Sequence, residues 1–255
     1  MEFHAAQDGR AAADKAFALI EGHASAVPGS RMVSARGATI LLEELCVEDR
    51  DGCCPDHLNA VIQPGRVTVL TGVNGAGKST TLQAIAGITA ATSGRITMAG
   101  IDIADLEPSE WWRQLSWLPQ RPVLVPGTVA DNLALFGVLA DAETACAAAG
   151  FDDVVTELPD GMQTFIGRDG TGLSLGQRQR LGLARALGSP APVLLLDEPT
   201  AHLDATAAAR VLHTIVERAR AGDTVVLVGH RQQVVGIGDQ VVDVVAAGNL
   251  HHAVI

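Results

Sequence analysis

Short, uninterrupted runs of apolar residues recur along the chain and predict buried strands. The strongest runs lie at residues 67–70, 193–196 and 224–228. A strand in a parallel sheet is covered on both faces, so it reads as a continuous apolar run and not as an alternating one. Helical periodicity appears between these runs, at residues 79–88, 176–187 and 205–221. Strands that alternate with helices predict an α/β fold built on a parallel sheet.

The first 35 residues follow a different pattern. Residues 5–20 carry an apolar stripe at helical spacing, and the breakers Gly22, Pro28 and Gly29 follow it. The strand-like pattern begins only near Ala38. We therefore expect a helix and linker at residues 1–35 and a globular domain at residues 36–255. No apolar run reaches the roughly 20 residues that a membrane-spanning helix needs.

A glycine-rich loop follows the first apolar run. It reads GVNGAGKST and fits the pattern G-x-x-x-x-G-K-[ST] between a predicted strand and a predicted helix. Backbone amides of such a loop wrap phosphates, Lys78 reaches the outer phosphates, and the Ser79 hydroxyl ligates magnesium. The loop predicts a nucleotide site that takes ATP and Mg²⁺. Its binding residues are Asn74, Gly75, Ala76, Gly77, Lys78, Ser79 and Thr80.

Two carboxylates end the second apolar run, at Asp197 and Glu198. Ligands of open α/β sheets bind at the carboxyl edge of the strands. Asp197 is placed there to hold magnesium, and Glu198 is placed to orient or deprotonate an attacking water. The sequence thus predicts hydrolysis of the bound nucleotide, with Glu198 as a catalytic residue.

Charge narrows the choice of partners. Eighteen basic residues stand against 29 acidic ones, which gives a net charge of −11. Sequence-independent binding of nucleic acid or of anionic lipid needs a basic surface. We therefore expect no nucleic acid partner.

The four cysteines raise a separate question. Cys53 and Cys54 are adjacent, and His57 follows them closely. These residues could bind a metal or sense redox state, but no second ligand pair stands at zinc spacing. A reduced loop without a special role is the favoured interpretation.

A second phosphate-binding turn lies about a hundred residues after the first, in TGLSLGQRQRLGL at residues 171–183. Small and polar residues run directly into a helix, and helix starts bind anions. LSLGQ matches the signature of ATP-binding cassette (ABC) proteins, and the chain resembles their nucleotide-binding domain from about Ala38 to its end. Further matches are Gln120 in LSWLPQ, the D-loop at residues 201–204, and the switch histidine His230 in VVLVGH.

The resemblance implies a specific architecture and mechanism. It implies a P-loop (RecA-like) parallel sheet core with an antiparallel β subdomain and a helical subdomain at about residues 110–187. Two such domains would meet head to tail, so that Ser174, Gly176 and Gln177 contact the ATP of the partner domain. Leu175 is expected to pack against its own chain. Glu198, His230 and Gln120 would act in catalysis, and magnesium would be held by Ser79, Gln120 and Asp197.

The sequence segments that flank these motifs resemble those of exporters whose membrane helices are fused to the ATPase. The connector-like segment implies a longer protein with a transmembrane domain, placing the chain on the cytoplasmic face of the bacterial inner membrane. PQRPVLVPGTVADNLALFG and the aliphatic residue of LSLGQ are most similar to the CydD/CydC exporters, and to CydD in particular. That resemblance implies a heterodimer linked to cysteine or glutathione export and to cytochrome bd assembly.

Two departures from the family pattern keep alternatives open. The aromatic residue that usually stacks on adenine would fall near Asp49, and the chain has no tyrosine; Arg50 is a substitute. The acid–base pair before the signature is reversed, as Arg168-Asp169. A regulatory ABC subunit that barely hydrolyses ATP and a non-transport ABC ATPase both remain as alternative interpretations.

Overall fold

The structure is a computed structural model, and it describes residues 29–49 and 52–247. The predicted helix at residues 5–20 and the candidate adenine contact Arg50 lie outside the described residues. The described chain divides into two compact units. We call them the helical unit (Gln120–Pro190 and Thr200–Thr214) and the sheet unit (the described residues up to Pro119, Ala191–Pro199, and Ile215 onward).

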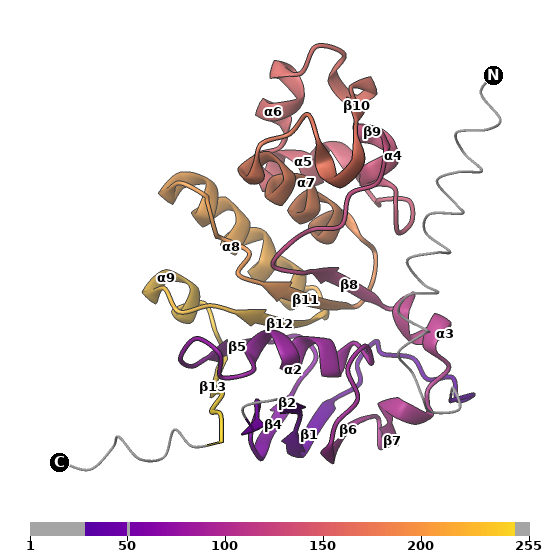
Figure 1. The fold of residues 1–255 in the computed structure, drawn as a ribbon, viewed down its shortest axis with the longest axis vertical. Helices are drawn as coiled ribbons and strands as arrows, with labels where there is room; N and C mark the ends of the chain where they lie inside the picture. The colour runs from indigo at the N-terminus through magenta and orange to yellow at the C-terminus, as the bar shows by residue number, and fades with distance from the viewer. Residues whose placement is uncertain (1–28, 50–51, 248–255) are drawn as a thin grey trace. The chain divides into compact units, whose positions relative to one another are not determined.

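A five-stranded parallel sheet forms the centre of the sheet unit, in the order β13-β5-β12-β11-β8 (Figure 1). The three apolar runs are its central strands and are buried along nearly their whole length, which confirms the predicted parallel α/β core. The strand bounds are β5 Val67–Thr71, β8 Leu115–Leu118, β11 Val193–Asp197, β12 Thr224–Val228 and β13 Gln240–Asp243.

An antiparallel sheet in the order β4-β1-β6-β7 completes this unit. Helix α2 (Lys78–Ile85) lies between the two sheets (Figure 1), and its side chains Leu82 and Ile85 belong to one apolar core with residues of both. This arrangement confirms the antiparallel β subdomain. The remaining elements are β1 Ile40–Cys46, β2 Glu48–Asp49, β3 Gly52–Cys53, β4 Leu58–Ile62, β6 Ser93–Met98, β7 Ile101–Asp102, α3 Pro108–Trp112 and α9 Gln232–Val235.

Helix α2 ends three residues before the predicted boundary at residue 88. The reason is Gly87, whose φ of +72° places it in the left-handed region that terminates helices. Two indole groups then close the helix, because Trp111 Nε1 donates to the carbonyl of Ile85 at 3.1 Å and Trp112 Nε1 donates to that of Ala86 at 3.0 Å.

The helical unit is dominated by α7 (Leu175–Gly188), along which α5 packs. Buried Arg185 joins α7 to its surroundings, because its Nε donates to the carbonyl of Asn132 at 2.9 Å and its Nη1 to that of Val123 at 3.0 Å. The helix that carries the signature segment is therefore held by packing against α5 and by hydrogen bonds from Arg185 near its end. Its other elements are β9 Gly127–Thr128, α4 Val129–Leu133, α5 Ala142–Ala149, α6 Asp152–Glu157, β10 Phe165–Ile166 and the start of α8 Ala205–Arg220.

Candidate functional site

Three neighbouring strands bring the predicted chemistry to one edge of the parallel sheet. Leu70 of β5 pairs with Val228 of β12, and Val228 pairs with Asp197 of β11. The glycine-rich loop follows β5, Glu198 follows β11, and His230 follows β12 shortly after the strand ends. Because parallel strands end at the same edge, their register places these groups together, as expected for an α/β ligand site.

The glycine-rich loop owes its shape to close backbone neighbours. Gly72 and Gly77 have φ of +133° and +98°, in the left-handed region. A Cβ at Gly72 would lie 2.3 Å from the carbonyl oxygen of Val244, and one at Gly77 would lie 2.3 Å from the Cys54 carbonyl carbon. Glycine is therefore required at both positions even without a bound phosphate, because neighbouring backbone atoms of the protein leave no room for a side chain. The sequence does not predict these neighbours because they are remote along the chain.

The side chain of Lys78 folds back onto the start of this loop. Lys78 is 9% exposed, and its Nζ donates to the carbonyls of Gly72 at 2.9 Å and Val73 at 2.8 Å. Helix α2 begins at Lys78, and no side chain caps its N-terminus at Gly77. The uncapped amides and the ammonium therefore supply positive potential on one side of the loop. Asn74 and Gly75 are exposed at the loop's tip, while Ala76 is buried and Ser79 and Thr80 are half-buried.

Asp197 is the acidic counterpart of this loop. It is 5% exposed, and burial raises the pKa of its carboxyl; nearby Glu198 adds to the rise, while a hydrogen bond with Ser79 and the charge of Lys78 oppose it. A buried carboxylate and a hydroxyl are hard oxygen donors, which Mg²⁺ prefers. The side chains of Asp197 and Ser79 therefore fit a magnesium ion at this position.

Glu198 and His230 face each other across the sheet edge. His230 Nδ1 lies 3.9 Å from Glu198 Oε1, and the side chains are 67% and 31% exposed. Glu198 has a φ of +50°, which is uncommon for a residue with a side chain and is frequent at functional sites. A half-buried carboxylate that still reaches solvent, beside an imidazole, can orient and deprotonate a water molecule. The structure thus brings these two predicted residues together.

The other predicted site residues belong to the helical unit. Gln120 is exposed. Ser174 caps helix α7: the Gln177 amide donates to Ser174 Oγ at 3.3 Å, and the Ser174 amide donates to Gln177 Oε1 at 2.8 Å. This reciprocal pair fixes the start of α7 and engages the Gln177 side chain within its own chain.

Leu175 and Gly176 form the first turn of this helix. Leu175 is 58% exposed, so the expectation that it packs against its own chain is wrong. A Cβ at Gly176 would meet no atom within 4 Å. The first turn of α7 therefore combines an exposed leucine side chain with open space beside Gly176, while the amides of Ser174 and Gln177 are engaged by the capping pair.

Replacing Gly77 by alanine tests the close approach behind the loop. The substitution meets both a positive φ and the Cys54–Pro55 backbone, whereas Gly75→Ala meets a positive φ of +80° and open space. Left-handed strain costs roughly 1–2 kcal/mol per residue, so Gly75→Ala should lower the free energy of unfolding by about that amount. Gly77→Ala should lower it clearly further. Urea denaturation of both variants measures the difference, and equal losses would contradict the close contact.

Comparison with known proteins agrees with this geometry. Residues 55–201 match the family described as ABC transporter. The chain is 36% identical over 242 residues to the ATP-dependent lipid A-core flippase of Nitrosococcus oceani, covering 92% of this chain and 40% of that protein. It is 36% identical over 223 residues to the mycobactin import ATP-binding/permease protein IrtB of Mycolicibacterium thermoresistibile, covering 86% of this chain and 38% of that protein.

A solved structure shows the same fold. It is a bacterial Atm1-family ABC exporter with ATP bound, which superposes with a TM-score of 0.77 at 28% identity and covers 91% of this chain and 41% of that one. The chain thus spans less than half the length of these relatives. No helix in the part of the chain that the structure describes is long and apolar enough to cross a membrane. With its P-loop, acidic strand end and signature helix, the chain belongs to the ABC transporter family, as an ATP-binding and ATP-hydrolysing domain of the kind that exporters carry.

Proposed function

We propose that this chain is the motor domain of an ABC exporter, in which ATP hydrolysis at the P-loop drives transport through a membrane domain. The observation that carries the proposal is the Glu198–His230 pair at 3.9 Å, at the sheet edge where the P-loop begins. A domain that only bound nucleotide would not need this pair. The similarity to the Atm1-family exporter supports the same conclusion.

The proposed roles follow the chemistry of each group. Glu198 orients and deprotonates the water, His230 contacts the γ-phosphate, and Gln120 reaches the water. When bound, Mg²⁺ would neutralise developing phosphate charge, held by Ser79, Asp197 and Gln120. The residues that would bind the nucleotide of this chain are Asn74, Gly75, Ala76, Gly77, Lys78, Ser79 and Thr80.

The proposed assembly is a pair of ATPase domains arranged head to tail. Ser174, Gly176 and Gln177 would complete the ATP site of the partner domain, a role that the exposed start of α7 supports. ATP would then join the two domains, and hydrolysis would release them. We assign residues 1–35 to a connector from the membrane domain and residues 36–255 to the ATPase domain, with a helical subdomain at about residues 110–187. In the proposed assembly, the chain would lie on the cytoplasmic face of the bacterial inner membrane.

The proposed substrate class is a thiol, cysteine or glutathione, as in CydD/CydC exporters. This finer proposal rests on the phrase PQRPVLVPGTVADNLALFG and on Leu175 of the signature. The test is uptake of labelled glutathione and cysteine into inverted vesicles that contain the complete transporter. Uptake should require ATP and should disappear in the Lys78→Ala variant. ATP hydrolysis without thiol uptake would reject thiols as the substrate class but would leave the proposed ATPase function intact.

The two alternative functions make different predictions. A regulatory subunit would bind ATP and leave the rate of hydrolysis unchanged when Glu198 is replaced. A non-transport ABC ATPase would work without a membrane domain, whereas an exporter subunit should hydrolyse ATP fastest in the complete, membrane-embedded transporter. Both comparisons use the same phosphate-release assay.

ATP and GTP should bind with similar affinity. The position expected to stack on the base falls near Asp49, and the sequence contains no tyrosine. Base–aromatic stacking is worth about 1–3 kcal/mol, so without it the base contributes little preference. Competition between the two nucleotides for the chain measures the ratio. A preference for ATP above about tenfold would show that another residue recognises adenine.

A further inference from the structure

A cluster of metal-binding side chains lies outside the nucleotide site, in the antiparallel part of the sheet unit. The Sγ atoms of Cys46 and Cys53 and a carboxylate oxygen of Asp56 all lie within 4.8 Å of one another. Cys46 ends β1, Cys53 ends β3, and Asp56 stands in the loop before β4. The sequence draws attention to the adjacent pair Cys53-Cys54 as candidate metal ligands. In the structure, Cys46 and not Cys54 is the second thiol next to Cys53.

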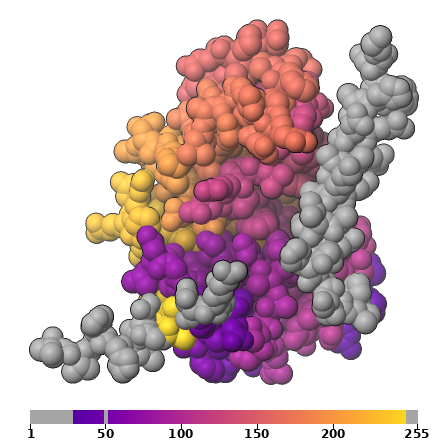
Figure 2. Space-filling model, viewed as in Figure 1, coloured from indigo at the N-terminus to yellow at the C-terminus, as the bar shows by residue number. Residues whose placement is uncertain are grey.

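The backbone of this cluster is held in place from the far end of the chain. The carbonyl of Cys53 accepts a hydrogen bond from the Ala247 amide at 2.8 Å, and the Asp56 amide donates to the carbonyl of Val245 at 2.9 Å. Figure 2 shows the corresponding yellow residues of the C-terminal segment against the indigo residues of this region. The donor atoms are therefore presented by a fixed backbone, which lowers the ordering cost of binding a ligand.

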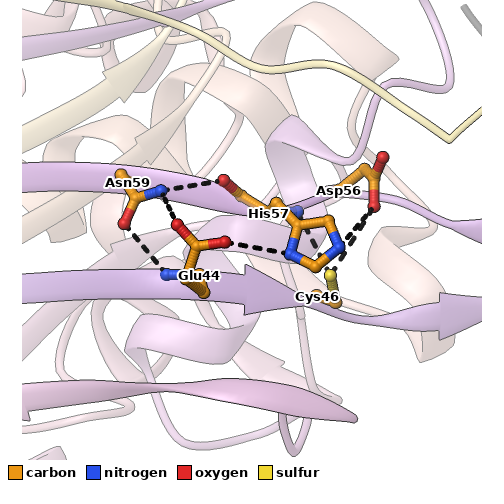
Figure 3. Close-up of polar contacts among 5 residues, drawn as sticks. All are labelled: Glu44, Cys46, Asp56, His57 and Asn59. Carbon is orange, nitrogen blue, oxygen red and sulfur yellow. Dashed lines mark hydrogen bonds and ion pairs between the residues drawn. The ribbon is translucent and has the colours of Figure 1, made fainter.

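His57 extends the cluster with an oriented imidazole (Figure 3). Its Nδ1 lies 3.1 Å from Glu44 Oε2, and its Nε2 lies 3.8 Å from Asp56 Oδ1. Asn59 in turn donates to the other oxygen of Glu44 and accepts from the Glu44 amide. A carboxylate on one ring nitrogen, with the other directed at a ligand set, is the arrangement that orients histidine toward metal ions.

We propose that Cys46, Cys53 and Asp56 bind one zinc ion, with His57 as the fourth ligand once its exposed side chain turns from Asp56 toward the metal. Thiolates, an imidazole and a carboxylate are all donors that zinc takes in tetrahedral sites. Magnesium and calcium take oxygen donors, and this cluster offers only one carboxylate among its candidate ligands. Cys46 is buried while Cys53 and Asp56 are half-buried, so the site is open to metal on one side.

The local charge of the cluster favours a cation. A carboxylate oxygen of Asp56 lies within 4.8 Å of both sulfurs, and Glu48 pairs with Cys53 between strands β2 and β3. These acidic groups surround the thiols and attract a cation. A reactive redox cysteine needs the opposite, electropositive surroundings. The environment therefore supports metal binding over use of the thiols as a redox couple.

The site adjoins the nucleotide loop through one peptide bond. The bond between Cys54 and Pro55, which lies between the ligands Cys53 and Asp56, is the backbone that an added Cβ at Gly77 would strike at 2.3 Å. A metal that fixes Cys53 and Asp56 thus also fixes the surface on which the P-loop rests. We expect zinc to raise the thermal stability of the chain.

Cobalt titration of the reduced, metal-free full chain tests the site. Co²⁺ substitutes for zinc and reports its ligands by absorbance. One equivalent should bind with a thiolate-to-cobalt charge-transfer band and tetrahedral ligand-field bands, and zinc should displace it. Cys53→Ser and Asp56→Asn should each weaken binding at least about tenfold. Cys54→Ser is the matched control, because it removes the neighbouring thiol outside the cluster and should bind as the wild type does.

Several results would overturn the proposal. They are a cobalt spectrum without the thiolate band, wild-type affinity in Cys53→Ser, and equal losses in Cys53→Ser and Cys54→Ser. Loss of the Cys46 and Cys53 thiols in air, together with no cobalt binding by the reduced chain, would identify a redox pair instead. Circular dichroism of each variant separates lost ligation from lost folding.

Discussion

Replacing Glu198 by glutamine is expected to leave ATP binding intact and to lower turnover by orders of magnitude. The substitution keeps the size of the side chain and removes the charge that orients and deprotonates water. General-base catalysis typically contributes about 10²–10⁴-fold. Glu198 is 31% exposed at its side chain, so the neutral amide is tolerated without a buried, unpaired group. Steady-state phosphate release by the assembled transporter and nucleotide binding to the chain measure the two effects separately.

Glu217→Gln provides the matched control for this variant. Glu217 lies on α8, is 55% exposed at its side chain and pairs with Arg220 at 3.2 Å, away from the nucleotide loop in sequence. The Glu217→Gln variant should hydrolyse ATP at the wild-type rate. Near wild-type turnover in Glu198→Gln would remove Glu198 from the catalytic role and favour the regulatory alternative.

The second large effect is expected at Gly176. An aspartate there would place a carboxylate beside the phosphate of the partner's ATP and should abolish hydrolysis at the site that this chain completes. Folding should be preserved, because the space around Gly176 is open and an acidic residue in the first turn of α7 complements the helix dipole. The measurement is ATPase activity of the assembled pair, with the substitution in this chain alone.

Leu175→Gly is the uncharged comparison for Gly176→Asp, because it weakens the same helix turn without adding a charge. Loss of helix propensity should cost roughly 1 kcal/mol, and activity should change little because the proposed contacts with the partner's ATP come from Ser174, Gly176 and Gln177. A severalfold rise in turnover would identify the leucine as a brake on a slow site. Unchanged hydrolysis in Gly176→Asp would show that the signature does not face a hydrolysed ATP.

Much of this fold can be predicted from short sequence patterns, because the central strands stand out as continuous apolar runs. The runs that form β5, β11 and β12 are apolar on both faces, and the P-loop motif stands between a strand and a helix. Strand register then places Asp197 at the same edge as the loop. The end of α2 is less predictable, since left-handed Gly87 stops a helix whose apolar pattern continues.

Long-range contacts explain what the sequence does not predict. The neighbour of Gly72 is Val244, and the neighbour of Gly77 is the Cys54–Pro55 backbone. Cys46 and Cys53 are closer in sequence, and they meet because the chain folds back on itself between β2 and β3, where Glu48 pairs with Cys53. Leu175 is misread for a different reason: an apolar residue at a helix start predicts burial in a single chain, and its exposure fits a surface that serves a second domain.

Light scattering of the Glu198→Gln chain tests the central claim most directly, because the variant should hold ATP without hydrolysing it. The chain should be monomeric without nucleotide. With ATP and magnesium, together with the second ATPase domain of the same transporter, it should form a complex with the mass of two domains, and Gly176→Asp should prevent the association. A stable dimer without nucleotide, or no association when both domains have bound ATP, would contradict the proposal that ATP joins this chain to a partner domain.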